Sequence, residues 1–565
     1  MRPFATRRAQ TSGAAYLSKV LTEERRQSGL VYTPTHLVDF VIAQAEYGAH
    51  SWGPLLDAAC GCGAFLEGAV RVIARFTVER GSSRAEFLER VEGDLFGIDI
   101  DSNACALAAA AVRRAVQEAS PGRMSPSFFS KNIVCGDFLT TDFGKATGHQ
   151  EFAFIVGNPP YVSATRLNAE RKAALRENFS TATGRLDLYT VFIERAVRLL
   201  TPRGRAAFIT PDKFLVSRSA RSLRSFLLGS TSVRLIARFS SHRVFADAAT
   251  VPCVSVFERS RSKRSVALLH CDADGAGAPA MVRVTARATV PQETLTEQPW
   301  YLVDPAALKL ARKLQAGRLR LTAVTLRVSA GPATGRDRVF VFPHGSEPGV
   351  EPVLIRPAVR GRDVESYGIT DPRLDILVPY TYDKAGRGTL VDLKRFPGAA
   401  RYLAQYRDEL RTRHCVRVWK KPWYDIHDQA AVDLARLKKL LVPDVANSNR
   451  FAVDDGHFFP LHSAYYLLPA PGVDLQFLCG LLNSRIASFF VRVFSPVVKD
   501  GFNRYRQQFL TEIPVPIATS AQQKEIATAA NRGDAAAVND LFSGLFRLSR
   551  ADASTLRAIL GADRS

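Results

Sequence analysis

The chain has 565 residues, a length that fits two to four domains. Hydrophobic residues make up 46% of it and charged residues 23%, an ordinary globular balance that provides a core without disulfide staples. Lysine and arginine exceed aspartate and glutamate by 76 − 54 = 22, which favours a polyanionic partner, with nucleic acid ahead of an anionic membrane.

Other features disfavour a secreted or membrane protein. Residues 1–10 include basic side chains but no apolar core follows them, unlike a signal peptide, and no apolar run is long enough to span a bilayer. The cysteines are scattered, and the close pair Cys60 and Cys62 has the wrong spacing for a zinc site. We therefore expect a cytoplasmic protein with buried free thiols, no metal and no membrane association.

The first half of the chain has the pattern of an α/β fold. Residues 1–30 are polar and basic, and we expect an arm or a first helix there. Buried strands are predicted for the apolar runs at 55–59, 95–100, 152–158 and 205–210, and helices for the amphipathic stretches at 38–45, 64–76 and 188–200. Strands that alternate with helices predict one doubly wound, Rossmann-like sheet over residues 31–260.

The remainder changes character at about residue 260. Residues 261–300 are basic and then rich in Ala, Gly and Thr, which suggests a linker that includes one strand. Residues 301–518 are richer in Arg, aromatics and Pro, and we expect a second domain of mixed α+β type. Residues 519–565 are Ala-rich and predict a helical tail.

A strand, a tight glycine turn and a helix start occupy residues 55–66. Gly61 and Gly63 permit positive φ and a close approach of the backbone, so a ligand can lie against the turn together with Asp57 and Ala59. A Gly-x-Gly turn alone is weak support, because it also occurs as mere strand–helix punctuation.

Two further acids follow predicted strands. Asp99 ends the strand at 95–100 and is placed to hold a ribose diol, whereas Asp101 is better interpreted as a helix N-cap. Asp137 is placed to accept from an adenine amine, with Phe138 against the adenine ring. Each acid alone is more often a cap or turn residue, but three at successive strand ends favour a ligand site, because open sheets bind ligands there.

The most specific motif is Asn158-Pro159-Pro160-Tyr161, which directly follows a buried strand. The prolines fix φ and lack amide donors, so their carbonyl groups are free to accept. The Asn158 side chain and the Pro159 carbonyl are two acceptors that can hold both N–H bonds of a planar amine. They would draw its lone pair toward a methyl electrophile, while Tyr161 offers a ring face to the base. The plainer interpretation is a rigid Pro-Pro turn that closes a strand.

The order of these motifs resembles the gamma class of amino-methyltransferases, specifically the Taq-type adenine DNA methyltransferases. The motifs that carry the resemblance are Tyr32-Thr33-Pro34, the glycine turn, Asp99, Asp137, the Asn-Pro-Pro-Tyr motif, Leu188-Tyr189, Ile209-Thr210-Pro211 and Val244-Phe245-Ala246-Asp247. In the second half they are Gly331-Pro332-Ala333-Thr334-Gly335, Arg360-Gly361-Arg362-Asp363-Val364, Leu481-Leu482-Asn483-Ser484 and Ile513-Pro514. The likeness spans residues 31–518. Cys62 stands where Ser or His is more usual, and Asp99 where Glu is also common.

The resemblance implies a Rossmann-like methyltransferase sheet followed by a mixed α+β target-recognition domain. It implies S-adenosylmethionine as the cofactor, double-stranded DNA as the partner, and transfer to the N6 amine of a flipped adenine. Thr33 would touch the methionine end of the cofactor, Asp57 would order the turn or contact the cofactor's amino group, and Phe245 would stack on the target base. We expect a monomer, and leave open whether a restriction nuclease or other defence subunits accompany it.

Clusters of cations, amides and aromatics in the second half are candidates for DNA contact. The candidate residues are Arg360, Arg362, Lys421, Arg450, Lys499, Asn503 and Arg504. Arg and Asn can read base edges and Lys mostly positions phosphates, but each cluster taken singly is more often a solvated face. The pattern does not distinguish which cluster reads bases.

Three alternatives remain open at this stage. The methylated amine could belong to cytosine, to an RNA base or to a protein glutamine, although a basic second domain of some 200 residues is surplus for a small protein substrate. The chain could be a bifunctional restriction enzyme, but residues 1–30 contain no Asp with which to build a metal-dependent nuclease. It could also be a non-catalytic DNA-binding subunit, against which the intact Asn-Pro-Pro-Tyr motif argues.

Overall fold

The structure is a computed structural model. It describes residues 33–48, 52–125, 127–162, 167–184, 186–239, 251–262, 264–273, 281–301, 305–346, 348–370, 372–495 and 502–561. The chain divides into two compact units, Met1–Leu302 and Val303–Ser565. Arm residues 1–30, Phe245 and Lys499 lie outside the described residues.

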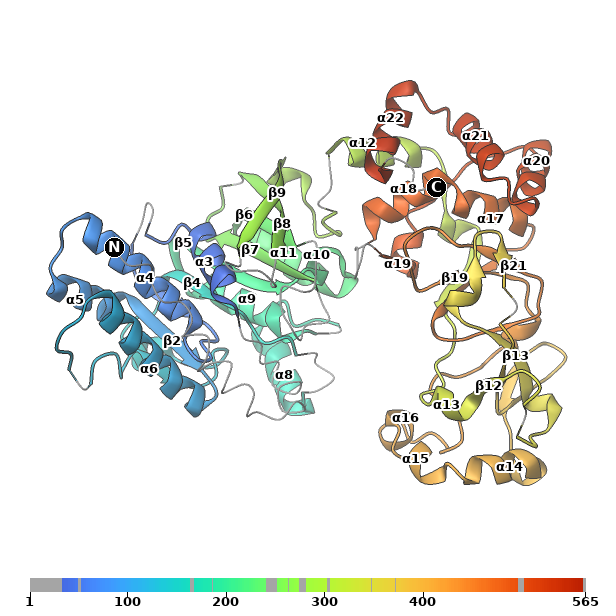
Figure 1. Ribbon diagram of the computed structural model, residues 1–565, viewed down its shortest axis with the longest axis horizontal. Coiled ribbons are helices and arrows are strands. Elements are labelled where there is room, and N and C mark those ends of the chain that lie inside the picture. Colours follow the sequence, from blue (N-terminus) through green and yellow to red (C-terminus); the bar gives the residue numbers. More distant parts are fainter. Residues whose placement is uncertain are drawn as a thin grey trace. The chain divides into compact units, whose positions relative to one another are not determined.

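The first unit is built on one large mixed sheet (Figure 1). Its strands are β1 (Leu55–Asp57), β2 (Leu95–Asp99), β3 (Ile133–Cys135), β4 (Phe152–Gly157), β5 (Leu200–Pro211), β6 (Ser232–Phe239), β7 (Pro252–Glu258), β8 (Ser265–Ala273) and β9 (Val282–Pro291). Within the described residues their order is β3-β2-β1-β4-β5-β7-β6-β8-β9. Strands β3 to β5 run parallel in the order of a doubly wound dinucleotide fold, and β7 is antiparallel to both of its neighbours.

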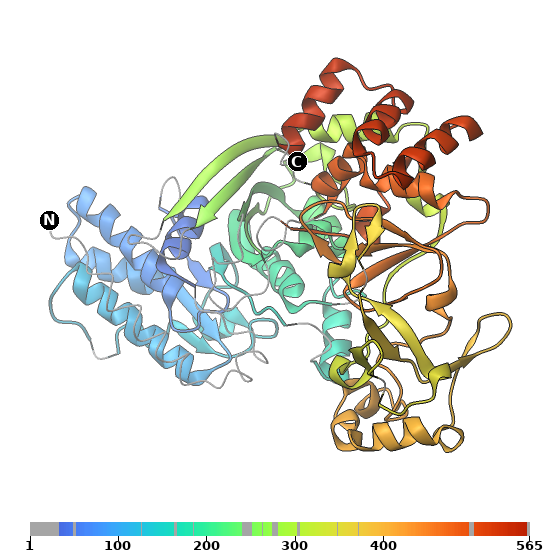
Figure 2. The same cartoon turned by 45° about the vertical axis from the view of Figure 1, so that its right-hand side comes forward.

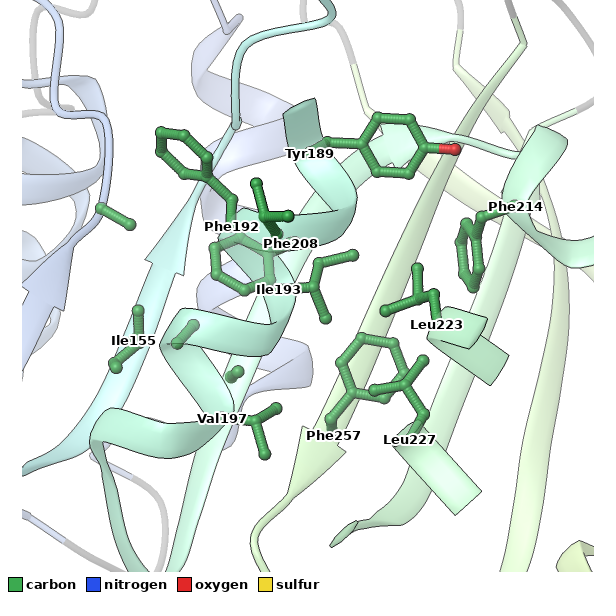
Figure 3. Packing of buried hydrophobic residues seen from close by; sticks show 14 of the residues in the cluster. Ile155, Tyr189, Phe192, Ile193, Val197, Phe208, Phe214, Leu223, Leu227 and Phe257 are labelled. Atoms are coloured by element: carbon green, nitrogen blue, oxygen red, sulfur yellow. The ribbon is translucent and has the colours of Figure 1, made fainter. Parts of the chain in front are cut away.

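Helices cover both faces of this sheet. They are α3 (Thr35–Gln44), α4 (Ala64–Glu79), α5 (Arg84–Asp94), α6 (Ser102–Ala119), α7 (Phe143–Thr147), α8 (Ala169–Asn178), α9 (Leu188–Leu199), α10 (Lys213–Val216) and α11 (Arg221–Ser230). Side chains alternate between the faces along each strand, so Leu55 packs with α3, α4 and α6 while its neighbour Leu56 packs with α9 and α11. Figure 3 shows the second of these cores, where Phe192 and Ile193 of α9 meet Phe208 of β5.

The strand and helix predictions for the first half are confirmed at each run named. Sequence also explains how individual helices begin. Asp101 caps α6, because its carboxylate accepts from the backbone N–H groups of Asn103 (2.8 Å) and Ala104 (3.4 Å), as expected. Ser83 and Glu86 form a capping box at the start of α5.

The linker interpretation of residues 261–300 is wrong for residues 265–273 and 282–291. Strands β8 and β9 fall within it, and β8 pairs in parallel with β6, so the segment extends the sheet (Figure 2). Alternate residues of β9 are exposed, because this strand is the edge of the sheet. Its Arg and Thr residues therefore gave the segment the composition of a loop although it forms a strand.

The second unit is of mixed α+β type. Its strands are β10 (Leu319–Arg320), β11 (Thr325–Ala330), β12 (Val341–Pro343), β13 (Ile355–Val359), β14 (Val364–Glu365), β15 (Gly368–Ile369), β16 (Leu374–Leu377), β17 (Tyr380–Tyr382), β18 (Gly388–Leu390), β19 (Lys439–Pro443), β20 (Val445–Ala446), β21 (Ala452–Asp454), β22 (Phe459–Pro460), β23 (Ala464–Pro469), β24 (Asn503–Arg504) and β25 (Pro514–Val515). Its helices are α12 (Pro305–Gln315), α13 (Asp337–Phe340), α14 (Pro397–Ala404), α15 (Arg407–Arg411), α16 (His414–Arg417), α17 (Leu475–Asn483), α18 (Arg485–Phe494), α19 (Gln507–Leu510), α20 (Ser520–Asn531), α21 (Ala535–Leu545) and α22 (Arg550–Leu560).

Two four-stranded sheets form the centre of this unit, in the orders β11-β23-β19-β21 and β12-β16-β13-β22. The predicted helical tail is α20 to α22, which packs on α17, α18 and α12. No single described helix is long and apolar enough to cross a membrane, although α17 and α18 pass that test as a pair bent by 61°. All eight cysteines are free, but Cys62 is half-buried and Cys135 is exposed, contrary to the expectation that every thiol is buried.

Candidate active site

The glycine turn after β1 is shaped by its two glycines. Gly61 has φ +49° and open space where a side chain would begin, so the turn can accept a ligand there. Gly63, at φ +90°, directly precedes α4, and a Cβ on it would lie 2.9 Å from the Cα of Ala108 in α6. The backbone N–H of Ala59 donates to Asp57 Oδ1 at 3.3 Å. The turn thus presents its open side at Gly61, as the sequence predicts.

Asp57 is the most buried acid of this group. Its side chain is 0% exposed and its Oδ2 atom has no hydrogen-bond partner among the described residues. Burial, reinforced by the nearby charge of Asp99, raises the pKa of Asp57 to about 8 although the Ala59 amide opposes this shift. An unpartnered buried oxygen at the end of β1 is suited to a ligand that brings its own donor.

Asp99 lies beside the turn, at the end of the neighbouring strand β2. Its Oδ2 accepts from the Gly61 N–H at 2.9 Å, and its Oδ1 accepts from the Asp101 N–H at 3.0 Å. Burial raises the pKa of Asp99, and these two backbone N–H groups counter the rise. Each carboxylate oxygen retains a further lone pair, so Asp99 can still accept from a diol.

Asp137 follows β3 at the same edge of the sheet. Its Oδ1 accepts from the Leu139 N–H at 3.0 Å, and Arg171 of α8 forms an ion pair with its Oδ2. Arg171 was not predicted, because it lies 34 residues away along the chain and only the fold brings it to this carboxylate.

Phe138 is a core residue, contrary to the prediction that its ring lies against adenine. Its side chain is 2% exposed, and its ring stacks on Phe192 of α9 with centroids 5.1 Å apart. The ring therefore faces the interior of the first unit and presents no open face to a ligand.

The Asn-Pro-Pro-Tyr motif leaves β4 through Gly157, whose φ is +152°. A Cβ on Gly157 would lie 3.0 Å from Asp57 Oδ1, so glycine lets the motif approach that acid closely. Asn158 Nδ2 donates to Thr33 Oγ1 at 3.1 Å, while Asn158 Oδ1 is buried without a partner among the described residues. Thr33 therefore orients the amide so that its acceptor atom is the one left unused.

The rest of the motif is held firmly. Pro159 is buried and Pro160 is half-buried. The Tyr161 hydroxyl donates to the carbonyl of Ile209 at 3.1 Å, and burial raises the pKa of Tyr161 far above its usual value. Because the hydroxyl is anchored in β5, the half-buried ring is fixed beside Asn158.

These residues meet at one edge of the sheet because β1 to β4 are parallel. Asp57 pairs in register with Gly97 and Val156, and Asp99 with Cys135, so the carboxyl ends of four strands coincide. The edge carries three carboxylates, an open glycine turn and an oriented amide oxygen. Within the described residues, no group of three or more His, Cys, Asp or Glu side chains is placed to hold a metal ion.

Two of the predicted DNA contacts are used inside the second unit instead. Lys421 Nζ donates to the carbonyls of Ile426 and His427, each at 3.1 Å, and pairs with Asp425 at 3.0 Å. Asn503 is buried in β24, which pairs with Ala446 and its neighbour. Asn503 is too buried to meet a nucleic acid, so that prediction is wrong. Lys421 keeps 22% of its side chain exposed, and a phosphate would have to compete with its three partners, so a DNA contact there stays a prediction.

The other predicted DNA contacts lie at the surface. Arg362 is exposed and 3.7 Å from the carboxylate of its neighbour Asp363, and Arg360 is half-buried. Arg450 pairs with Glu365 at 3.3 Å. Arg504 pairs with Asp444, also at 3.3 Å. A phosphate would have to compete with these carboxylates, which leaves Arg362 the most accessible of the four.

Comparison with known proteins identifies both halves of the chain. Residues 94–245 match the Eco57I restriction-modification methylase family, and residues 356–515 match the TaqI-like C-terminal specificity domain. The chain is 26% identical over 548 residues to the Type II methyltransferase M.PaeR7I of Pseudomonas aeruginosa, with 94% of this chain and 93% of that protein covered. It is also 26% identical over 551 residues to the Type II methyltransferase M.XhoI of Xanthomonas vasicola, with coverage of 93% and 98%.

A solved structure supports the same fold. The Type IIL restriction-modification enzyme MmeI, solved in complex with DNA, superposes with a TM-score of 0.64 at 15% identity, covering 97% of this chain and 81% of that one. The chain is therefore a restriction-modification DNA methyltransferase. More particularly, it joins an Eco57I-type methylase domain to a TaqI-like specificity domain, which confirms the resemblance to the gamma class.

Proposed function

We propose that this methyltransferase transfers a methyl group from S-adenosylmethionine to the exocyclic N6 amine of an adenine flipped out of duplex DNA. The observation that carries the proposal is the buried Oδ1 of Asn158, which has no hydrogen-bond partner in the described part of the chain and is held in one orientation by Thr33. A buried acceptor without a donor costs about 1–3 kcal/mol, so its retention at a strand end points to a donor supplied by the substrate.

An exocyclic amine fits this acceptor because it carries two N–H bonds in one plane. Asn158 Oδ1 accepts one of them and the Pro159 carbonyl accepts the other, which draws the nitrogen lone pair out of conjugation and toward the methyl donor. Holding the amine in line with the donor supplies most of the rate enhancement. After transfer the methylated amine is acidic and loses its proton without a strong base.

The cofactor site would lie at the sheet edge formed by the carboxyl ends of β1 to β4. The open turn at Gly61 would receive the cofactor, with Asp99 on its ribose, Asp137 on its adenine amine, and Asp57 and Thr33 toward its methionine end. The unpartnered oxygen of Asp57 and the space at Gly61 support this fit. When bound, S-adenosylmethionine supplies an electrophilic methyl group on a sulfonium.

The substrate base must leave the duplex to reach Asn158, at a cost of a few kcal/mol. Tyr161 would recover part of this cost by stacking, about 1–3 kcal/mol for one aromatic contact, because its hydroxyl is already anchored at Ile209. By the family resemblance, Phe245 supplies the opposite ring face. Removing either ring should weaken the bound, flipped state more than binding of unflipped DNA.

The test is methyl transfer by the purified full chain from labelled S-adenosylmethionine to plasmid DNA, followed by mass analysis of the nucleosides. We expect N6-methyladenine, and at least about 100-fold less of it from Asn158→Ala, with DNA binding retained. Asn178→Ala, at an exposed asparagine of α8, is the matched control and should match wild type. If the product is N4-methylcytosine, the substrate base is cytosine and not adenine. Activity of Asn158→Ala within tenfold of wild type would refute the role of Asn158.

A further inference from the structure

An exposed tryptophan follows the short helix α16 in the specificity domain. Trp419 is 53% exposed and its neighbour Val418 is 59% exposed, which is unusual for large apolar side chains. The next residue, Lys420, has φ +57°, a left-handed conformation that a lysine adopts only at a cost. Such positions persist where the surroundings enforce them, and they concentrate at functional sites.

A buried arginine braces the segment 418–428, hereafter the Trp419 loop. Arg413 is 3% exposed, and its guanidinium donates to the carbonyls of Thr334 (2.8 Å), Trp423 (2.6 Å) and Asp425 (2.7 Å). Because the charge is used entirely on backbone oxygens, Arg413 fixes the path of the loop rather than contacting a partner.

Lys421 provides a second brace from within the loop. It binds the carbonyls of Ile426 and His427, together with the carboxylate of Asp425. The other oxygen of Asp425 accepts from the Tyr380 hydroxyl at 2.8 Å, which ties the loop to β17. Two cations and one acid thus hold this surface loop in a single conformation.

The bracing positions the indole at the surface. Two imidazoles lie against the Trp419 ring, with centroids 5.3 Å away at 87° for His414 and 4.8 Å away at 53° for His427. The backbone N–H of His427 donates to the Thr334 carbonyl at 3.1 Å, so one of these supports is itself fixed. Half of the indole nevertheless remains exposed, so the loop presents a rigid aromatic surface.

The chain around Trp419 carries several exposed cations, together with the exposed acid Asp408. Lys420, Arg411 and Arg417 are exposed and make no ion pair within the described residues. The exposed acid at the end of the loop, Asp428, accepts from the backbone N–H of Ala333 at 2.9 Å. Within the second unit, α14 to α16 gather at one end, away from α20 to α22 (Figure 1).

We infer that the Trp419 loop is a duplex-DNA contact of the specificity domain, with the Trp419 ring against the edge of a base or sugar and Lys420 on a phosphate. The inference rests on the proposed function, because it takes DNA as the substrate. A preorganised aromatic on a segment with exposed cations suits duplex DNA, since the cations attract the phosphate backbone while the ring offers an apolar surface to base edges and sugars. Within the loop, Trp419 and Lys420 are exposed, whereas Lys421 is half-buried and binds Asp425.

The experiment measures affinity of the full chain for two duplexes, one containing the methylated site and one of random sequence, between 50 and 200 mM salt. The site is first located by modified-base sequencing. Lys420→Asn removes the charge while Asn tolerates the left-handed conformation, and it should weaken both duplexes equally and lower the salt slope by about 1. Trp419→Ala should weaken the specific duplex about tenfold or more and the random duplex less, and Trp419→Phe should restore much of the loss.

Controls separate the possible failures. Lys524→Gln, at an exposed lysine of α20, should leave the affinity for both duplexes unchanged. All variants should keep the wild-type thermal unfolding transition of the second unit, which contains the substituted residues and so shows that they fold. If both loop variants bind both duplexes within twofold of wild type with an unchanged salt slope, the inference fails. If the loop variants lose affinity but the product is not N6-methyladenine, the proposed function fails and this contact remains.

Discussion

Asp57 makes the stability of the first unit depend on pH in an unusual direction. A carboxyl group in water titrates near 4, but burial raises the pKa of Asp57 to about 8 in the folded chain. Between these values the folded state holds a proton that the unfolded state has released. Stability therefore falls as pH rises through this window, and the loss is complete above pH 8.

The expected size follows from the shift. Each pKa unit corresponds to about 1.4 kcal/mol, so between pH 5 and pH 9 Asp57 should cost on the order of 4 kcal/mol of unfolding free energy. Asp57→Asn preserves the shape and cannot ionise, so this cost should disappear. The unpartnered Oδ2 atom becomes an amide group in that variant, which adds a constant offset but no pH dependence.

The assay is thermal unfolding of the full chain and of Asp57→Asn, without cofactor, at intervals between pH 5 and pH 9. The quantity compared is the difference between the two proteins in the transition of the first unit, since the second unit does not contain this residue. We expect the difference to move in favour of Asp57→Asn by several kcal/mol as pH rises. A difference that stays constant across this range would show that Asp57 remains ionised and solvated in the folded chain.

Three further predictions concern other residues. Arg171→Ala should tighten cofactor binding about two- to fivefold by calorimetry, because it frees the carboxylate of Asp137; weaker binding would mean that Arg171 orients that acid. Lys439→Met should destabilise the second unit by about 3–5 kcal/mol, because it leaves the buried carboxyl of Asp454 without its partner at 2.5 Å; unchanged thermal unfolding would contradict this. A chelator should leave methyl transfer unchanged, because Asn158 and the Pro159 carbonyl activate the amine by accepting its N–H bonds. The purified chain should not cut plasmid DNA with added magnesium, and specific cleavage would refute this prediction.

Features governed by neighbours along the chain could be predicted from the sequence. The strand runs at 55–59 and 152–158 are short and apolar, and both form strands. Asp101 precedes a helical stretch and caps it. The convergence of Asp57, Asp99 and Asn158 was also predictable, because parallel strands place their carboxyl ends at one edge.

Features governed by distant partners could not be predicted. Phe138 follows the acid expected at the cofactor, but its position on the core side depends on Phe192, which only the fold brings near. Lys421 stands among exposed aromatics and cations, yet the carbonyls that bind it belong to the returning part of its own loop. Arg171 has no local signal at all, since its partner Asp137 is supplied by a different strand. Composition alone does not distinguish an exposed cation from a bracing one.

This distinction bears on how the chain meets DNA. The formal excess of 22 positive charges overstates the charge available to a duplex, because Arg413 and Arg224 are buried and donate to backbone carbonyls. Counterion release depends on the phosphates that are contacted, not on net charge. The salt slope of DNA binding should therefore be below the value that net charge suggests, and Lys420 beside Trp419 should account for a share of it that a single substitution can measure.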